Sequence, residues 1–201
     1  MNIQKAIQEL RKEEKRKFIQ TVDLIVNLQK FDSRKESINS FIQLHHVGER
    51  KICGFLTRRT SLVDTIIKED FDKFKEEADM KKLANKYDAF IAVASLMPAI
   101  ATKFGRVLGP LGKMPSPQAG IIPLDNDNAV KEMLDKMKKL VRVRTKEKSI
   151  KIAIGKESMP DKEIEENIHA AVSAIENLLP KKKENVKNIM IKFTMTKAVK
   201  L

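Results

Sequence analysis

Residues 21–28 read TVDLIVNL, and this stretch decides the fold of both ends of the chain. Its apolar residues fall at every second position, at Val22, Leu24, Val26 and Leu28. Side chains two residues apart point to the same face of a β-strand, so one face of this segment is apolar and the other is mixed. The pattern predicts a half-buried strand, which needs further strands beside it.

The segments next to this strand are one helix and one further strand. Before it, apolar residues recur at helical spacing and predict an amphipathic helix, at Ile3, Ala6, Ile7 and Leu10. After a polar connection at residues 32–36, residues 38–44 predict a second strand, close enough in the chain to form a hairpin with the first. One helix and two strands do not make a stable sheet by themselves.

The middle of the chain has a different pattern. Strands and helices are expected to alternate, with strands at residues 51–56 and 87–94 and helices at residues 61–68, 72–85 and 126–140. The two strand candidates are nearly continuous apolar runs, which are typical of parallel sheets covered on both faces. With a Gly- and Pro-rich loop at residues 105–123, this part predicts a compact α/β unit.

The last part of the chain predicts strands and one long helix, at residues 141–144, 150–154, 160–179 and 189–193. The helix has one buried face, because its apolar residues recur at spacings of three and four. Pro180 ends it, and Lys181, Lys182 and Lys183 place positive charge beyond its C-terminal end, where charge of that sign complements the helix dipole. The closing β-α-β unit also lacks a complete sheet.

The two incomplete ends are therefore expected to combine. We predict an α/β fold of two domains, in which residues 1–50 and 144–201 form a discontinuous α/β domain with a mostly antiparallel sheet. Residues 51–143 form an inserted, Rossmann-like α/β domain. The chain would cross between the domains near Glu49 and Thr145, and two such connections can act as a double hinge.

The chain carries a large excess of positive charge. Its 40 Lys and Arg residues outnumber 27 Asp and Glu residues, which gives a net charge of +13. Such an excess indicates a polyanionic partner, with nucleic acid as the first candidate and an anionic membrane as the second. Nine Phe, one Tyr and no Trp are few for a platform on which single-stranded bases stack, so structured RNA fits better.

Other kinds of site have little support. No apolar run approaches the roughly 18 residues of a membrane-spanning helix, and the first residues lack the order of a signal peptide, so we expect a soluble, cytoplasmic protein. Cys53, the single cysteine, lies between Ile52 and Gly54 and is expected to be a small buried hydrophobe. No acidic or sulfur residue stands near His45 and His46 at a sequence spacing typical of metal sites, so we expect a surface turn and no metal site. The carboxylates lie beside lysines in helices of mixed charge, and we expect no catalytic site and no cofactor.

Residues 105–120 read GRVLGPLGKMPSPQAG and hold four of the seven glycines, so backbone freedom is concentrated in this loop. A surface that faces a polyanion is one interpretation, in which glycine lets the backbone approach phosphate and Arg106 and Lys113 add charge. A rigid connector over the end of the sheet is the other. A nucleotide-binding enzyme would need Ser or Thr after the Gly-Lys pair, and Met114 follows Gly112 and Lys113.

The same loop carries a resemblance to a known family. Residues 86–123, including Tyr87, Met97, Pro98 and the glycine-rich stretch, resemble the second domain of the ribosomal protein L-one family, and its archaeal members most. Three further motifs stand in the right order elsewhere, so the resemblance covers nearly the whole chain. They are Lys17, Phe18, Thr21 and Val22; Gly155, Lys156, Ser158 and Met159, with Asn167 and Ile168 in the long helix; and Thr194 with Met195.

The resemblance implies a structural protein of the large ribosomal subunit that binds ribosomal RNA and is not an enzyme. In the family, the split domain holds the main RNA site, and the inserted domain adds contacts and mobility. The family's place is the mobile stalk beside the exit site for transfer RNA, which makes transfer RNA a second expected partner. Many prokaryotic members also repress translation by binding their own messenger RNA, and that role is left open.

Carried over by position, the expected RNA contacts are Lys17, Phe18 and Thr21; Gly155, Lys156 and Ser158; and Thr194, Met195 and Thr196. The lysines can neutralise phosphates, the hydroxyls can reach phosphate or ribose oxygens, and Phe18 and Met195 offer apolar contact to sugars. Several of these residues also have a structural alternative. Phe18 or Met195 could fill the core, Lys17 could belong to a solvated face, and Ser158 could cap the long helix.

One position departs from the family pattern. Members typically carry Gly after the Thr-Met pair, whereas this chain has Thr196 followed by Lys197. If the turn requires a positive φ, Thr196 costs affinity, which Lys197 recovers in part by its charge. Two functions of other classes remain as alternatives: a nucleotide-binding enzyme that uses the glycine-rich loop, and a basic adaptor for membranes or acidic proteins.

Overall fold

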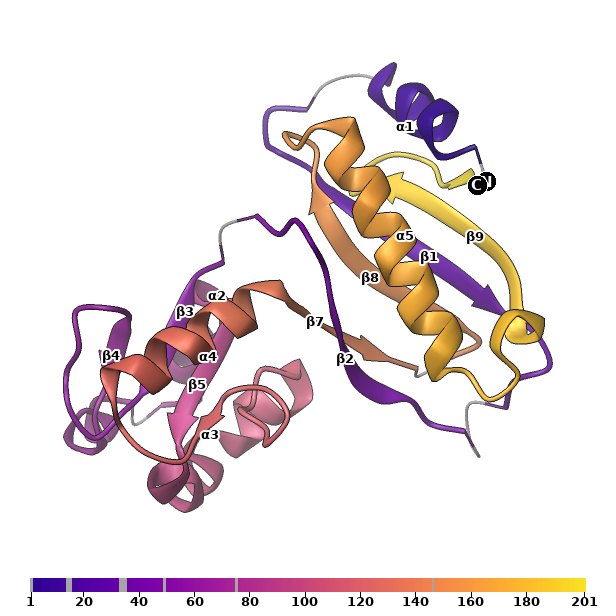
Figure 1. Cartoon of the computed structure of the whole chain (residues 1–201). Coiled ribbons are helices and arrows are strands. Elements are labelled where there is room, and N and C mark those ends of the chain that lie inside the picture. The colour runs from indigo at the N-terminus through magenta and orange to yellow at the C-terminus, as the bar shows by residue number, and fades with distance from the viewer. Residues whose placement is uncertain (1, 14–15, 33–35, 49, 75, 146) are drawn as a thin grey trace. The chain divides into compact units, whose positions relative to one another are not determined.

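The computed structural model describes residues 2–13, 16–32, 36–48, 50–74, 76–145 and 147–201. It shows a mixed α/β protein with several sheets, and the predicted α/β class is confirmed. The chain divides into two compact units. The terminal unit combines Met1–Gly48 with Lys139–Leu201, and the central unit is Glu49–Lys138 (Figure 1).

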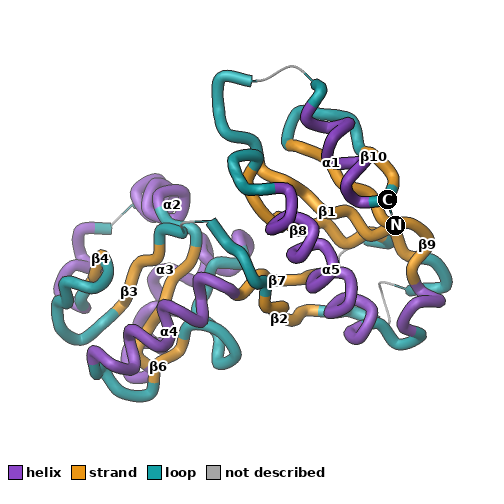
Figure 2. Tube along the Cα trace, turned by 45° about the horizontal axis from the view of Figure 1, so that its top comes forward, coloured by secondary structure: helices purple, strands orange, loops and turns teal. Residues whose placement is uncertain are grey.

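A four-stranded antiparallel sheet, in the order β10-β9-β1-β8, forms the centre of the terminal unit. The N-terminal strand β1 (Thr21–Leu28) lies between two C-terminal strands, β8 (Ser149–Lys156) and β9 (Val186–Phe193). The short strand β10 (Val199–Lys200) pairs with the other edge of β9 and lies beside helix α1 (Ile3–Arg11) (Figure 2). Both ends of the chain are therefore needed to complete one sheet.

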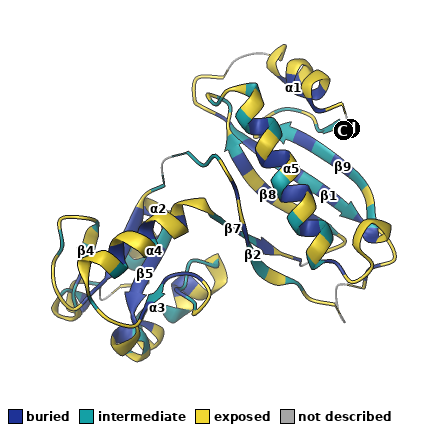
Figure 3. Ribbon diagram, viewed as in Figure 1, coloured by how far each residue is buried: buried dark blue, intermediate teal, exposed yellow. Residues whose placement is uncertain are grey.

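One hydrophobic core joins this sheet to α1 and to the long helix α5 (Asp161–Leu178). The four apolar residues predicted to share a face of β1 are at most 5% exposed, while the alternate positions are only half-buried. α5 turns Ile164, Ile168 and Ile175 onto the same core. Figure 3 shows buried and exposed positions along this helix. Full burial of one such aliphatic side chain contributes about 1.5–3 kcal/mol, so this core dominates the stability of the unit.

The strand predicted at residues 38–44 forms a different pair from the expected hairpin. β2 (Asn39–Gln43) pairs antiparallel with β7 (Leu140–Arg144), and the hairpin prediction is wrong. The reason is that β8 and β9 occupy both edges of β1. Because β7 joins β2, the compact central unit ends at Lys138, whereas we predicted an inserted domain that extends to residue 143.

Of the two expected crossings between domains, Glu49 lies outside the described residues. Thr145 is 4% exposed and lies within the terminal unit. Its hydroxyl accepts a hydrogen bond from the backbone N–H of Ile38 at 2.8 Å, and its own backbone N–H donates to the Ile38 carbonyl at 3.0 Å. Thr145 therefore extends the β2–β7 ribbon.

The central unit contains a parallel sheet in the order β4-β3-β5-β6. Its elements are β3 (Ile52–Phe55), β4 (Asp64–Ile66), α2 (Glu77–Lys86), β5 (Ala89–Val93), α3 (Met97–Leu111), β6 (Ile121–Ile122) and α4 (Asp127–Lys139). Four phenylalanine rings build part of its core. Phe104 lies 5.2 Å from both Phe55 and Phe71 by ring centroids, and Phe55 stacks on Phe90 at 5.5 Å.

Two helix predictions in the central unit need correction. Residues 61–68 do not form a helix, because 64–66 pair with β3 as the edge strand β4. A run of β-branched residues, Thr65, Ile66 and Ile67, favours a strand over the helix that its apolar spacing suggested. The helix predicted at residues 72–85 begins later, at Glu77, because a 3-10 helix occupies Lys68–Lys73.

The predicted loop at residues 105–123 is also partly wrong. Helix α3 continues through Gly105, Gly109 and Pro110 to Leu111, and Gly112 ends it in the left-handed conformation at φ 72°. Glycine inside a helix costs about 1 kcal/mol relative to alanine. The buried apolar face of α3 outweighs this cost, with Ile100, Phe104, Val107 and Leu108 all at most 4% exposed.

Cys53 is fully buried in β3, and its predicted role as a small hydrophobe is confirmed. Burial raises the pKa of its thiol to about 12, and the nearby carboxylate of Asp64 adds to the shift. The thiol is therefore protonated and unreactive in the folded protein at neutral pH. None of the described helices is both long enough and apolar enough to cross a membrane.

We predict that Gly120→Ala destabilises the central unit by about 2 kcal/mol or more. The backbone at Gly120 has φ +108°, and a Cβ atom there would lie 2.7 Å from the carbonyl oxygen of Phe90. Gly105→Ala is the matched control, because a Cβ there meets nothing within 4 Å and the site is helical. Thermal unfolding should show a lower Tm for the first variant and an equal or higher Tm for the second. Equal Tm values would contradict this account.

Candidate nucleic-acid interface

Three segments that are far apart in the sequence meet at one end of the antiparallel sheet. They are residues 16–21 before and at the start of β1, residues 156–160 between β8 and α5, and residues 194–198 between β9 and β10. Antiparallel pairing brings them together, because Thr21 is paired with Lys156 and Val22 with Phe193. All nine residues that we expect to contact RNA lie in these segments or at the adjoining strand ends.

Gln20 connects the three segments and is only 2% exposed. Its backbone N–H donates to the Glu157 carboxylate at 3.3 Å, and its carbonyl accepts from the Glu157 backbone N–H at 2.8 Å. Its side-chain oxygen accepts from the backbone N–H of Met195 at 3.1 Å. One buried residue therefore holds the β8–α5 loop and the β9–β10 turn in place.

Our sequence reasoning missed Gln20, although a signal for it exists. Gln20 continues the alternation of Val22 and Leu24, so it is a polar residue on the buried face of the strand. A buried amide needs hydrogen-bond partners, and such a residue at a strand end therefore indicates a junction. The pattern does not say which segments supply the partners.

Threonine side chains close the β9–β10 turn. The hydroxyl of Thr196 accepts from the backbone N–H of Phe193 at 2.9 Å, and the Thr196 N–H donates to the Phe193 carbonyl at 3.2 Å. Thr194 accepts from the backbone N–H of Thr21 at 3.1 Å and so links the turn to β1. Among the described non-glycine residues, only Lys30 and Lys182 have a positive φ. Thr196 therefore avoids the strain that a left-handed turn would have imposed on it.

Gly155 allows the β8–α5 loop to fold closely over the strand end. A Cβ atom at Gly155 would lie 3.0 Å from the sulfur of Met159, which also accepts from the backbone N–H of Lys156 at 3.3 Å. The aliphatic stem of Lys156 passes 3.4 Å from the position of a Cβ at Gly48. Lys156 thus lies along the backbone while the residue as a whole stays exposed.

Arg11, the last residue of α1, holds the same loop from the other side. Its guanidinium donates to the carboxylate of Asp161 at 2.7 Å and to the backbone carbonyls of Glu157 at 3.2 Å and Met159 at 2.8 Å. An exposed ion pair alone adds little stability, but bonds to several groups fix one geometry of the loop. Arg11 is a second contributor that the sequence did not indicate.

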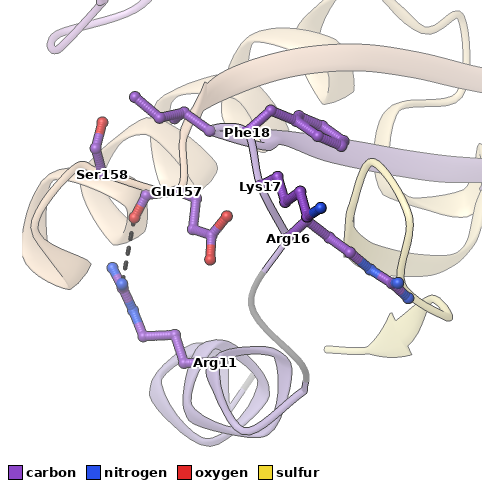
Figure 4. A pocket seen from close by; sticks show the side chains of 7 residues that line it. Arg11, Arg16, Lys17, Phe18, Glu157 and Ser158 are labelled. Carbon is purple, nitrogen blue, oxygen red and sulfur yellow. Dashed lines mark hydrogen bonds between the residues drawn. The ribbon is translucent and has the colours of Figure 1, made fainter.

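An open pocket of about 430 Å³ lies between α1, the segment before β1 and the β8–α5 loop. It is lined by Arg11, Arg16, Lys17, Phe18, Ile19, Glu157 and Ser158 (Figure 4). The lining combines three cations and one carboxylate with two apolar side chains and a hydroxyl, so its charge is positive on balance, whereas a purely apolar lining would suit a hydrophobic ligand. This composition suits a polyanion that also offers apolar surfaces, such as RNA.

The exposure of the predicted contact residues decides between some of their alternatives. Phe18 is 53% exposed and Met195 is 60% exposed, so the alternative that they fill the core is wrong. Ser158 does not cap α5, because Pro160 occupies that position and no side-chain cap bond forms. Lys17, Lys156 and Thr194 are exposed, and Thr21, Gly155 and Thr196 are half-buried. Contact with RNA remains a prediction for all nine residues.

Asn167 has a structural role beside the interface and is fully buried. Its amide nitrogen donates to the carbonyl of Ile154 at 2.8 Å and to that of His46, and its oxygen accepts from the His46 N–H at 3.0 Å. The His46 ring is 2.6 Å from a carboxylate oxygen of Glu166. The described residues contain no group of three His, Cys, Asp or Glu side chains that could hold a metal ion.

Lys113 in the glycine-rich loop does not face a polyanion, which corrects one interpretation of that loop. Its ammonium donates to the backbone carbonyls of Ala84 at 2.7 Å and Tyr87 at 2.8 Å, at the C-terminal end of α2. It therefore stabilises a helix end, where unpaired carbonyls and the helix dipole favour a cation. Arg106 remains exposed on α3.

Comparisons with known proteins point to one family. A family model described as "Ribosomal protein L1p/L10e family" matches residues 10–197. The large ribosomal subunit protein uL1 of Archaeoglobus fulgidus is 37% identical, over 98% of this chain and 95% of that protein. The protein of the same name from Thermococcus kodakarensis is 37% identical, over 92% and 89%. The one from Nanoarchaeum equitans is 32% identical, over 97% of each.

We predict that Gln20→Leu lowers the free energy of unfolding of the terminal unit by about 1–3 kcal/mol, because the Met195 N–H loses its buried acceptor. Gln43→Leu, at an exposed position of β2, is the control and should have a much smaller effect. Urea denaturation followed by circular dichroism measures both. Equal losses would show that Gln20 is not a junction.

We also predict that Thr196→Val destabilises the terminal unit by about 1 kcal/mol, because valine keeps the shape and removes the hydroxyl that accepts from Phe193. Thr196→Ser keeps the hydroxyl and should restore most of the stability. The same denaturation series compares the two variants. A valine variant as stable as the serine variant would exclude a role for the hydroxyl in the turn.

Proposed function

Since the chain belongs to the ribosomal protein L1p/L10e family, we propose that it is a structural constituent of the large ribosomal subunit and binds ribosomal RNA through its terminal unit. The family is not an enzyme family. One observation carries the choice of surface: three distant segments meet at one sheet end and expose cations, hydroxyls, an aromatic ring and a thioether together. These are the groups that folded RNA requires, because it is recognised through phosphates, riboses and shape.

Each side chain has a role that its position allows. Lys17 and Lys156 are exposed and can neutralise phosphates. Phe18 and Met195 can cover ribose or base faces that are excluded from water on binding. The Thr194 hydroxyl accepts from the Thr21 N–H at 3.1 Å and donates to the Thr21 carbonyl at 3.5 Å, so it is held in one place, where its second lone pair can accept from a ribose hydroxyl.

The fixed geometry of these segments supports the proposal further. Gln20 and Arg11 hold the β8–α5 loop through backbone groups, so little conformational entropy is lost when RNA binds. A preorganised surface discriminates between RNA shapes better than a flexible basic tail does. The same argument favours a structured RNA element as the ligand.

The proposal extends to the two units. The terminal unit, predicted as residues 1–50 with 144–201, is the split RNA-binding domain, and the central unit, predicted as residues 51–143, is the inserted domain, which adds contacts and mobility through a double hinge. The separate sheets and cores of the two units support this division. From the family resemblance alone, we further propose a place on the mobile stalk near the transfer RNA exit site, contact with transfer RNA, and repression of the protein's own messenger RNA.

The alternative function, a nucleotide-binding enzyme that uses the glycine-rich loop, has little support. Nucleotide binding by the glycine-rich loop would need Lys113 at the phosphates, whereas its ammonium is occupied by two backbone carbonyls. Gly105 and Gly109 lie inside α3 and do not form a phosphate-binding turn. We therefore propose no catalytic role for this chain.

We predict that Thr194→Ala, and separately Lys156→Ala with Phe18→Ala, weaken specific binding to a large-subunit RNA fragment by about tenfold or more each. Lys156 and Phe18 are exposed, so the fold of the double variant should remain intact. Thr194→Ala also removes the acceptor of the Thr21 N–H, so thermal unfolding of this variant checks that the turn is retained. Binding is measured across a salt series, in which log affinity should fall linearly with log salt concentration. The double variant should also have a shallower salt slope, because one phosphate contact is lost.

Lys68→Ala with Leu62→Ala is the control for the double variant. It also removes one exposed cation and one exposed apolar side chain, but from the central unit. It should leave specific affinity nearly unchanged. Unaltered affinity in both interface variants would exclude this surface as the main RNA site, and the absence of specific binding by the unmodified protein would exclude the proposed function.

A further inference from the structure

The end of the antiparallel sheet opposite the interface carries a second concentration of positive charge. Here β1 ends at Leu28, β8 begins at Ser149 and β9 begins at Val186. The adjoining segments carry six exposed lysines, which we call the distal lysine cluster: Lys30, Lys148, Lys181, Lys182, Lys183 and Lys187. The sequence suggested only that three of them complement the dipole of α5, whose last turn contains no basic residue.

A buried asparagine holds most of this cluster in a fixed arrangement. Asn185 is 1% exposed, and its amide nitrogen donates to the carbonyls of Gln29 and Lys30, both at 3.1 Å. Its side-chain oxygen accepts from the backbone N–H of Lys181 at 2.7 Å. The backbone N–H of Leu28 donates to the carbonyl of Lys148 at 2.8 Å. Three separate segments are thus tied together below their lysine side chains.

Two lysines of the cluster adopt a conformation that lysine rarely takes. Lys30 has φ 51° and Lys182 has φ 49°, and they are the only described non-glycine residues with a positive φ. Glycine or asparagine would fit these positions with less strain. The chain tolerates the strain and presents a cation at each position, which is the kind of outlier that points to a function.

The charge of the cluster is not neutralised within the protein. None of the six ammonium groups forms an ion pair within 4.0 Å with a carboxylate in the part of the chain that the structure describes. The acidic residues of the same segments are Asp32, Glu147 and Glu184, so the cations outnumber them. This end of the unit therefore has a net positive field.

We propose that the distal lysine cluster is a second RNA-binding surface, which contacts phosphates of a different backbone segment from the one at the interface. The inference rests on the proposed function. Stable attachment to a membrane or a protein partner normally adds exposed apolar anchors to such charge. The exposed large apolar residues among those described are Phe18, Ile19, Leu62, Leu111, Leu124 and Met195, and none lies in these segments. Phosphate binding needs only the cations.

The separation of the two surfaces sets the kind of RNA that can use both. β1 has eight residues, and a strand rises about 3.3 Å per residue, so the sheet ends are roughly 25 Å apart. A minimal RNA element bound at the interface would not reach the lysines. A longer RNA would cross the terminal unit along its sheet and gain phosphate contacts without added sequence specificity.

The test compares two RNAs and a variant that carries Lys148→Gln, Lys181→Gln and Lys183→Gln. Lys30 and Lys182 are retained, so the strained backbone is left unaltered. The first RNA is a large-subunit fragment trimmed to the shortest length that still binds specifically, and the second is the same fragment with its flanking helices. The variant should bind the long RNA about tenfold more weakly, with a salt slope smaller by roughly 2, and should bind the trimmed RNA as the unmodified protein does.

A matched control carries Lys5→Gln, Lys139→Gln and Lys200→Gln, which remove the same charge from exposed positions of the same unit that do not lie on β1, β8 or β9, the strands between the two sheet ends. It should affect the two RNAs equally and only slightly. No loss on the long RNA, an equal loss on both RNAs, or an equal loss in the control would each overturn the inference. If the unmodified protein bound neither RNA specifically, the proposed function would fail, and this inference with it.

Discussion

The position of β1 between β8 and β9 is the constraint on which the terminal unit depends. The alternation of Val22, Leu24 and Val26 fixes the register, because a slip of one residue would turn these side chains from the core to solvent. The partner strands begin more than a hundred residues later in the chain. Such pairing closes a long loop, so the sheet depends on contacts of high sequence separation, which form slowly in folding.

The same pairing creates the functional surfaces at both ends of the sheet. Antiparallel neighbours bring the start of β1 to the ends of β8 and β9, and the end of β1 to their starts. A buried amide then fixes the loops at each end: Gln20 and Asn167 near the interface, and Asn185 near the distal lysine cluster. Each of these amides is hydrogen-bonded, so a polar group that would be costly if unpaired instead specifies one loop geometry.

The spacing of apolar residues correctly predicted the elements whose buried side chains recur at regular intervals. The best examples are β1, with a period of two, and α5, with spacings of three and four. Prediction from spacing failed where longer-range packing decided the outcome. The glycines of α3 suggested a loop, because the apolar face that outweighs them is visible only once its partners in the core are known. The pairing of β2 with β7 could not be predicted from β2, because it depends on which strands occupy the edges of β1.

Local sequence also could not decide the roles of the site residues. Local sequence left Phe18 equally suited to the core and to a surface, and the exposed fraction of 53% in the folded chain separates the two. The conspicuous glycine-rich loop mostly serves the fold, because Gly112 ends a helix, Gly120 lies against a carbonyl and Lys113 stabilises the end of α2. A motif stands out when the backbone permits few substitutions. An RNA-binding surface made of exposed Lys, Thr and Ser carries no such restriction, so its residues become distinctive only through the fold that brings them together.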